Sequence, residues 1–190
     1  MKVETYLDQY YSEKAWMGER GGIDQAWIKV YVGPWDIIVP NTKARKKIVP
    51  YHDLHHLVSG YNNSRLGEGQ VAAWELGTHC LFSPLATLLN LFGMATGLLI
   101  DHRKILAAYK HGRQCNNLYR MPSTELMQLD VSIVNTMVNS KARPANTNIT
   151  RISFCFFAIS ALSIFAIISP FAFLNAKAAK RWISKNELLN

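Results

Sequence analysis

The sequence predicts a mainly α-helical protein with a small N-terminal β-hairpin and a C-terminal hydrophobic helix. Histidine and carboxylate residues recur at helical spacing between residues 52 and 79. Two long uncharged runs follow at 80–100 and 152–174, while β-branched and aromatic residues are concentrated at 26–39. A chain of 190 residues can hold one domain with a core, whereas two full domains would be crowded.

The first regular elements are expected near the N-terminus. Residues 26–39 form two β-branched and aromatic runs broken by a Gly-Pro pair, which predicts a hairpin. Asn41 or Thr42 can then cap a basic helical turn. Because Pro50 fits the first turn of a helix better than its interior, we expect a new helix to begin there and to end at Gly60.

A second helix is expected after a turn-rich stretch at 60–64, beginning near residues 66–68 and running toward Gly77 or beyond. The next run, 80–100, holds twenty-one uncharged residues, which is long enough for a membrane span. Pro84 and several polar residues weaken that interpretation, so a buried core helix or a lipid-contacting face stands beside it as an alternative.

The C-terminal half continues with a basic stretch at 103–120 and an amphipathic helical pattern at 123–138. Residues 152–174 then carry no charge. As a helix this run would be about 34 Å long, which is enough to cross the hydrocarbon core. A buried C-terminal helix is the alternative. The sequence thus divides into a metal-binding helical domain, a linker, a hydrophobic membrane segment and a basic tail, at residues 1–140, 141–151, 152–174 and 175–190.

The composition predicts a protein on the cytoplasmic side of a membrane, peripheral or anchored by the C-terminal hydrophobic segment. Hydrophobic residues make up 49% of the chain and charged residues 18%, a mix too apolar for disorder. The net charge of +8 suits anionic lipid headgroups. No nucleic-acid-binding motif accompanies that charge, so nucleic acid is not an expected partner. Three widely spaced cysteines and no signal-like N-terminus indicate a reducing compartment.

One segment carries side chains suited to binding a metal. On a helix, His52 and His56 lie one turn apart and Asp53 lies three residues before His56, so the three share a face. Glu68, on the next helix, completes the predicted ligand set. Imidazoles with carboxylates suit a divalent metal such as zinc, our first choice, or iron, cobalt or manganese, and do not suit calcium or magnesium.

The helix that carries Glu68 repeats polar positions along one side. Glu75 and His79 follow Glu68 at offsets of seven and eleven residues, which keeps them on that side of a 3.6-residue helix. We therefore expect Glu75 and His79 to be the catalytic pair, transferring protons or orienting the ligands.

Other interpretations of the histidine-rich helix remain open. Its histidines could simply pack and hydrogen-bond inside the core. The overlapping His52-x-x-His55-His56 pattern matches a histidine box of membrane desaturases and hydroxylases, but those enzymes need several boxes and the six histidines of this chain form no second one. A phosphohydrolase of the His-Asp type would need further His and Asp ligands on later helices.

The spacing His52-Asp53-x-x-His56, eleven intervening residues and then Glu68 resembles the metal motif of the family of coenzyme Q (ubiquinone) biosynthesis protein four. The resemblance implies that these four side chains are the metal ligands. His55 is an addition to the family pattern.

The segments at 40–45 and 111–119 also resemble bacterial relatives of that family, and the similarity covers roughly residues 20–140. It implies a mostly helical, membrane-associated fold with an apolar groove for a polyprenyl tail. It further implies ubiquinone synthesis by metal-dependent oxidative decarboxylation of a prenylated aromatic ring, in which hydroxyl replaces carboxyl. The C-terminal apolar segment is not part of the family core.

Three functions are therefore considered. The first is a decarboxylase acting on a lipid-linked aromatic ring. The second is a non-catalytic lipid-binding scaffold with a structural metal, whose ligand shell should be closed where that of an enzyme stays open. The third is a hydrolase that uses metal-bound water with Glu75 as base. Expected partners are a polyprenyl or other lipid, a membrane, and a biosynthetic complex or a second copy of the chain.

Overall fold

The computed structural model describes residues 1–13, 23–32, 34–140 and 147–187. Its elements are α1 (Val3–Glu13), β1 (Trp27–Val32), β2 (Trp35–Pro40), α2 (Lys43–Ser59), α3 (Arg65–Gly77), the 3-10 turn η3 (Cys80–Phe82), α4 (Pro84–Gly112), α5 (Ser123–Gln128), α6 (Val131–Asn139) and α7 (Thr147–Glu187). The described chain is mainly helical with one two-stranded antiparallel sheet, which confirms the predicted fold class.

The hairpin and the start of α2 follow from local sequence chemistry. β1 and β2 pair in antiparallel register with Val32 opposite Trp35, as the β-branched and aromatic runs predict. α2 begins after Thr42, whose hydroxyl oxygen accepts a hydrogen bond from the Arg45 N–H at 3.2 Å.

The predicted helix boundary at Pro50 is wrong, because α2 continues through it. Proline removes one hydrogen bond inside a helix. The turns on either side are held independently, by the Thr42 cap before Pro50 and by the fully buried Leu54 after it. The helix ends where the sequence predicts, at Gly60, which has a left-handed φ of 77° and donates its N–H to the His56 carbonyl at 3.0 Å.

α3 and α4 form the centre of the core through close backbone contact. A Cβ atom on Gly69 would lie 2.6 Å from the Cα of Gly97, and one on Gly112 would lie 2.0 Å from the Trp74 carbonyl oxygen. Only glycine allows helices to approach so closely. The glycines of the uncharged run thus serve a contact inside the domain, and this face of α4 is a core face.

A second part of the core lies between α1, α2 and the short helices after α4. Its buried side chains include Val3, Leu7, Tyr11, Leu54, Trp74, Leu118, Leu126 and Val134. The helix predicted at 123–138 is divided into α5 and α6, because Leu129 is extended at the boundary. The N-terminus is attached there, since the Val3 N–H donates to the Leu129 carbonyl at 2.9 Å.

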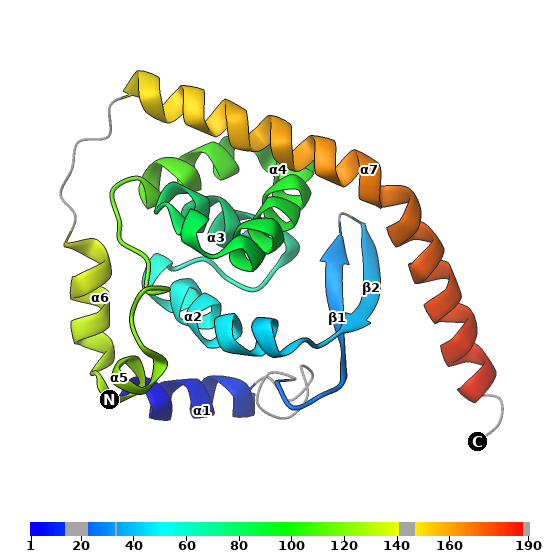
Figure 1. Ribbon diagram of the computed structural model, residues 1–190, viewed down its shortest axis with the longest axis horizontal. Coiled ribbons are helices and arrows are strands. Elements are labelled where there is room, and N and C mark those ends of the chain that lie inside the picture. Colours follow the sequence, from blue (N-terminus) through cyan, green and yellow to red (C-terminus); the bar gives the residue numbers. More distant parts are fainter. Residues whose placement is uncertain (14–22, 33, 141–146, 188–190) are drawn as a thin grey trace.

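α7 runs along one edge of the molecule, from beside α4 to beyond the hairpin (Figure 1). It includes residues 147–151 of the predicted linker, the hydrophobic segment and much of the predicted basic tail; residues 141–146 of the linker lie outside the described part of the chain. By length and composition, α4 and the 147–177 part of α7 are both able to span or anchor in a membrane.

Candidate metal centre

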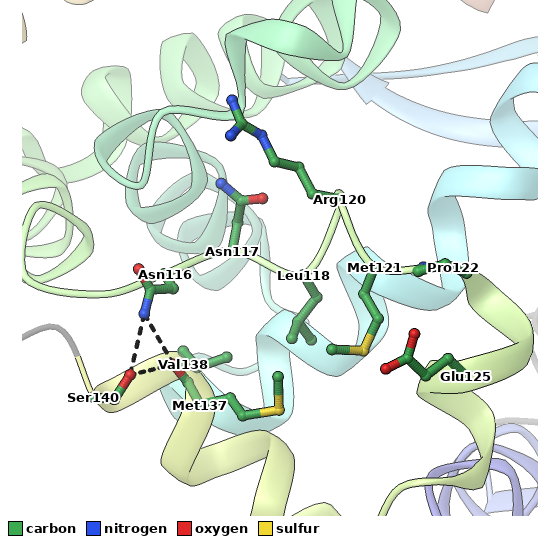
Figure 2. Close-up of a pocket in the computed structure, with 10 residues that line it drawn as sticks. All are labelled: Asn116, Asn117, Leu118, Arg120, Met121, Pro122, Glu125, Met137, Val138 and Ser140. Atoms are coloured by element: carbon green, nitrogen blue, oxygen red, sulfur yellow. Dashed lines mark hydrogen bonds between the residues drawn. The ribbon is translucent and has the colours of Figure 1, made fainter.

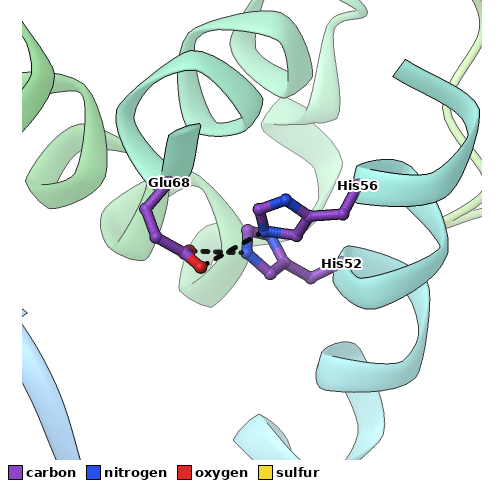
Figure 3. Close-up of side chains that lie close together, drawn as sticks. All are labelled: His52, His56 and Glu68. Atoms are coloured by element: carbon purple, nitrogen blue, oxygen red, sulfur yellow. Dashed lines mark hydrogen bonds and ion pairs between the residues drawn. The ribbon is translucent and has the colours of Figure 1, made fainter. Parts of the chain in front are cut away.

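The candidate centre lies where α2 and the first turn of α3 face each other. The turn between them is closed by Ser64, whose hydroxyl oxygen accepts the Gly67 N–H at 3.1 Å and caps α3. His52 and His56, one turn apart on α2, have ring centroids 4.9 Å apart. Glu68 extends toward both rings from α3 (Figure 3). The sequence prediction that these three side chains meet is confirmed.

The ligand atoms of the three side chains converge closely enough to hold one metal ion. The Nε2 atom of His52 is 3.3 Å from Oε2 of Glu68, and the Nε2 atom of His56 is 3.4 Å from Oε1. All three ligand atoms lie within 4.8 Å of one another. His56 is buried, while His52 and Glu68 are half-buried, so the group is reachable from one side.

Hydrogen bonds on the far side of each imidazole orient the two histidines. His52 Nδ1 lies 2.9 Å from the Glu75 carboxylate, and His56 Nδ1 lies 2.9 Å from the Tyr61 carbonyl. Both partners are acceptors, so each Nδ1 carries the proton and, in a neutral ring, Nε2 keeps its lone pair. Among the described residues, the buried Nε2 of His56 has no hydrogen-bond partner. A divalent metal would satisfy it.

Glu75 is fully buried and binds four polar groups. Its Oε1 lies 2.9 Å from His52 Nδ1 and 2.8 Å from His55 Nδ1. Its Oε2 accepts from the Asn90 amide and the Tyr119 hydroxyl, each at 2.6 Å. His55 accepts the Leu118 N–H at Nε2, 3.0 Å away, which fixes its proton on Nδ1, facing Glu75. Glu75 therefore orients a ligand histidine without facing the metal position itself.

Without a metal, the His52 ring is itself the cation between the Glu75 and Glu68 carboxylates. Burial raises the pKa of Glu75 and of Glu68, but the charges of the neighbouring histidines and their hydrogen bonds outweigh it and lower both pKa values. Burial lowers the pKa of His52, but Glu75 and Glu68 outweigh it and hold this pKa well above its usual value. The Tyr119 pKa is raised by burial and by the Glu75 charge, so its hydroxyl stays protonated.

Asp53 is near the centre but does not belong to the converging group. It is buried, and its Oδ2 accepts the Tyr11 hydroxyl from α1 at 2.6 Å. Burial raises the Asp53 pKa, although the His52 charge and the Tyr11 hydrogen bond oppose this shift. The sequence predicts Asp53 as a fourth ligand, and that role stays a prediction.

His79 is not brought to the centre. α3 ends at Gly77, and His79 follows in the left-handed conformation with a φ of 66°. Its exposed side chain contacts Arg113. An offset of eleven residues would place His79 on the same face as Glu68 only if α3 continued as far as His79. α3 ends two residues before His79.

Four side chains around the centre were not predicted as site residues. They are His55, Tyr11, Asn90 and Tyr119. Asn90 could have been predicted from the sequence, because a polar amide within an uncharged run needs a hydrogen-bond partner when it is buried. His55 lies within the motif itself, whereas Tyr11 and Tyr119 are distant in sequence and carry no local signal.

A cavity of about 540 Å³ lies away from the ligands, between the segment after α4 and α6 (Figure 2). Its lining includes Leu118, Arg120 and Met137 and none of the converging ligands. Leu118 lies between the centre and this cavity: its N–H donates to His55, and it is also one of the residues that line the cavity. Glu125 is the one carboxylate among the lining residues of the cavity, which include no histidine or cysteine.

Comparison of the chain with protein-family models, curated proteins and solved structures finds no match.

Proposed function

We propose that this protein is a metal-dependent enzyme of ubiquinone or related prenylated-quinone synthesis, which supports oxidative decarboxylation of a lipid-linked aromatic ring. One observation carries the metal-dependent part. One ligand atom from each of His52, His56 and Glu68 lies within 4.8 Å of the other two, and the buried Nε2 of His56 has an ion-pair contact with Glu68 at 3.4 Å but no hydrogen bond. The motif spacing of these residues supports the choice of reaction.

Zinc is the proposed metal, with iron, cobalt or manganese as alternatives, because two imidazoles and a carboxylate suit these ions. Three protein ligands are the number found in catalytic zinc sites, which leave a position for water or substrate. Asp53 lies outside the converging group, and its Oδ2 accepts the Tyr11 hydroxyl. This arrangement favours an enzyme over a scaffold with a closed structural metal.

The residues of the chain have distinct proposed roles. His52, His56 and Glu68 hold the metal, and Glu75 keeps the proton of His52 on Nδ1. When bound, the metal supplies a positive charge that polarises the phenolate or carboxylate of the substrate ring. Replacement of carboxyl by hydroxyl releases CO₂ and is a two-electron oxidation; with dioxygen as the proposed oxidant and water as the source of the hydroxyl oxygen, dioxygen is reduced to hydrogen peroxide.

A lipid-linked substrate requires a protein at a membrane. Two apolar helices, α4 and α7, and a net charge of +8 support the proposed location at the cytoplasmic face of a bilayer. A polyprenyl tail would be accommodated by the apolar side chains of these helices.

Metal analysis tests the centre. Purified protein should contain about one transition-metal ion per chain, and His56→Ala and Glu68→Ala should lose it. His102→Ala is the matched control, because His102 is exposed and outside the centre. Circular dichroism shows whether each variant is folded. A folded wild-type protein that takes up no metal after dialysis against zinc, iron, cobalt or manganese would refute the proposed centre.

Product analysis separates the enzyme from the scaffold. The metal-loaded protein is incubated in vesicles with a prenylated hydroxybenzoate and dioxygen, and CO₂ and the hydroxylated ring are measured by mass spectrometry. We expect product with the wild type and none with Glu68→Ala. A metal-loaded protein that binds the prenylated ring without changing it would favour the scaffold.

A further inference from the structure

α7 carries two apolar faces on opposite sides. Its inner face is buried against the domain at Thr150, Phe157, Ala161, Ala172 and Ala176. Its outer face, which we call the outer stripe, consists of Ile149, Ile152, Phe156, Ile159, Ile167, Phe171 and Leu174. Most of these recur every three or four residues, and Ile159 and Ile167 lie two turns apart, so they line one side of the helix. Each is between 56% and 71% exposed.

The inner face is attached to the domain near both ends of the hydrophobic segment. Near the N-terminal end, the Tyr109 hydroxyl of α4 donates to Ser153 Oγ at 2.9 Å, and the Tyr109 ring lies 6.0 Å from that of Phe157. Near the C-terminal end, the Ile38 N–H of β2 donates to Asn175 Oδ1 at 3.1 Å. α7 therefore lies along the domain over this whole length (Figure 1).

These attachments conflict with a transmembrane orientation of α7. Ser153 and Asn175 are twenty-two residues apart, or about 33 Å along a helix, which is the thickness of the hydrocarbon core. If the helix crossed the bilayer, α4 and the hairpin would be drawn into the hydrocarbon with it. A two-stranded sheet has open edges whose backbone groups cannot be satisfied there.

The charges of α7 indicate what covers the outer stripe. Between residues 147 and 177 the only charged residues are Arg151 and Lys177, one near each end and both exposed. No acidic residue lies between residues 147 and 177, so a second α7 helix packed on the outer stripe would offer these two cations no opposite charge. An anionic lipid surface attracts both cations.

We propose that the outer stripe lies in the plane of an anionic bilayer surface, so that α7 holds the domain on the membrane without crossing it. The stripe enters the boundary between headgroups and acyl chains, and Arg151 and Lys177 contact lipid phosphates at either end. This inference does not depend on the metal centre, which lies on α2 and α3.

Depth measurements on the full chain distinguish the two orientations. Cys155 is exposed while Cys80 and Cys115 are buried, so Cys155→Ser gives a background without an exposed native thiol. Single cysteines at Ile152, Ile159, Ile167 and Leu174 are labelled with a fluorophore and quenched by lipids brominated at different depths, in vesicles of phosphatidylcholine and phosphatidylglycerol. We expect the same shallow depth at all four positions.

Two outcomes would overturn the proposal. In a transmembrane helix, labels at the two ends of the series would lie about 33 Å apart along the membrane normal, with the deepest labels between them. In an α7 that pairs with a second copy or is covered by protein, no label would be quenched by brominated lipid.

Vesicle binding gives an independent readout. Phe156→Ser and Ile159→Ser should each weaken partitioning by about tenfold or more, because each removes a large apolar side chain from the bilayer. Arg151→Gln should weaken binding about fivefold on anionic vesicles and leave binding to neutral vesicles unchanged. Ile133→Ser, on α6 and also exposed, is the matched control and should bind as the wild type does.

Metal content, measured on the same samples, separates this inference from the proposed function. Outer-stripe variants should keep their metal, and Glu68→Ala should keep vesicle binding. Unchanged partitioning of Phe156→Ser and Ile159→Ser would refute the membrane contact while leaving the metal centre untouched.

Discussion

Tyr119→Phe tests whether the buried Glu75 carboxylate organises the centre. The Tyr119 hydroxyl donates to Glu75 Oε2 at 2.6 Å, and its ring lies 5.0 Å from that of His55 and 5.7 Å from that of Tyr51. Phenylalanine keeps both ring contacts and removes the hydroxyl alone. A hydrogen bond to a charged acceptor contributes about 1.5–3 kcal/mol, so the free energy of unfolding should fall by that amount.

Tyr51→Phe is the matched control for this experiment. Tyr51 also donates a hydrogen bond, to the Met121 carbonyl at 2.8 Å, but this acceptor is neutral. The expected loss is about 0.5–1.5 kcal/mol. Because the two rings are neighbours and the substitutions are identical, the difference between the two losses measures the charge of the Glu75 acceptor.

Urea denaturation followed by circular dichroism gives both values, at neutral pH and with a chelator present. The Glu75 pKa lies well below 4.5, so the difference should persist down to mildly acidic pH. If Tyr119→Phe costs no more than Tyr51→Phe, then Glu75 is not an ionised acceptor and its assigned role as the group that orients His52 is wrong.

Glu75→Gln should lower metal affinity about 10- to 100-fold by calorimetric titration, because the group that fixes His52 Nδ1–H loses its charge. Gly112→Ala should lower the free energy of unfolding by about 3 kcal/mol or more, because its Cβ would lie 2.0 Å from the Trp74 carbonyl oxygen. Gly60→Ala, which is strained only by a φ of 77°, should lower it by about 1–2 kcal/mol. Urea denaturation measures both losses. In chelator, His52 has a folded pKa above its ordinary 6.5, so its stabilisation is complete below about pH 6.5 and is lost as the pH rises through the folded value.

Glu125→Gln, an exposed glutamate on α5, should leave metal affinity unchanged, and an equal loss there would contradict the specific role of Glu75. Equal losses for the two glycine variants would contradict the close approach of α4 to α3. His52→Gln should abolish the decline in stability above about pH 6.5; a decline that survives this substitution belongs to another group.

The three converging ligands were predictable because their geometry is local. A spacing of four residues places His52 and His56 on one face of any α-helix, and the short turn before α3 leaves Glu68 little choice of position. The prediction failed for His79, because α3 ends at Gly77, where its backbone lies against Tyr109 and Gly112 of α4, and helical periodicity does not predict that contact.

The partners of the ligands were beyond local reasoning. Tyr119 and Asn90 reach Glu75 from positions 44 and 15 residues away, and the Leu118 N–H reaches His55 across 63 residues. Whether a buried carboxylate binds a metal or orients a ligand depends on which groups surround it. Helical spacing predicts the face on which Glu75 lies but not these contacts.

The sequence by itself determined the helical fold class, the hairpin, the three converging metal ligands and the two apolar segments. Each of these is predicted by a residue spacing of two to four or by the length of an uncharged run. The tertiary structure decided how these are used. Glycines bring α4 into the core, Tyr11 engages Asp53, and α7 is attached along the domain at both ends of its apolar segment. These features depend on contacts between residues far apart in the chain, and short-range periodicity carries no information about such contacts.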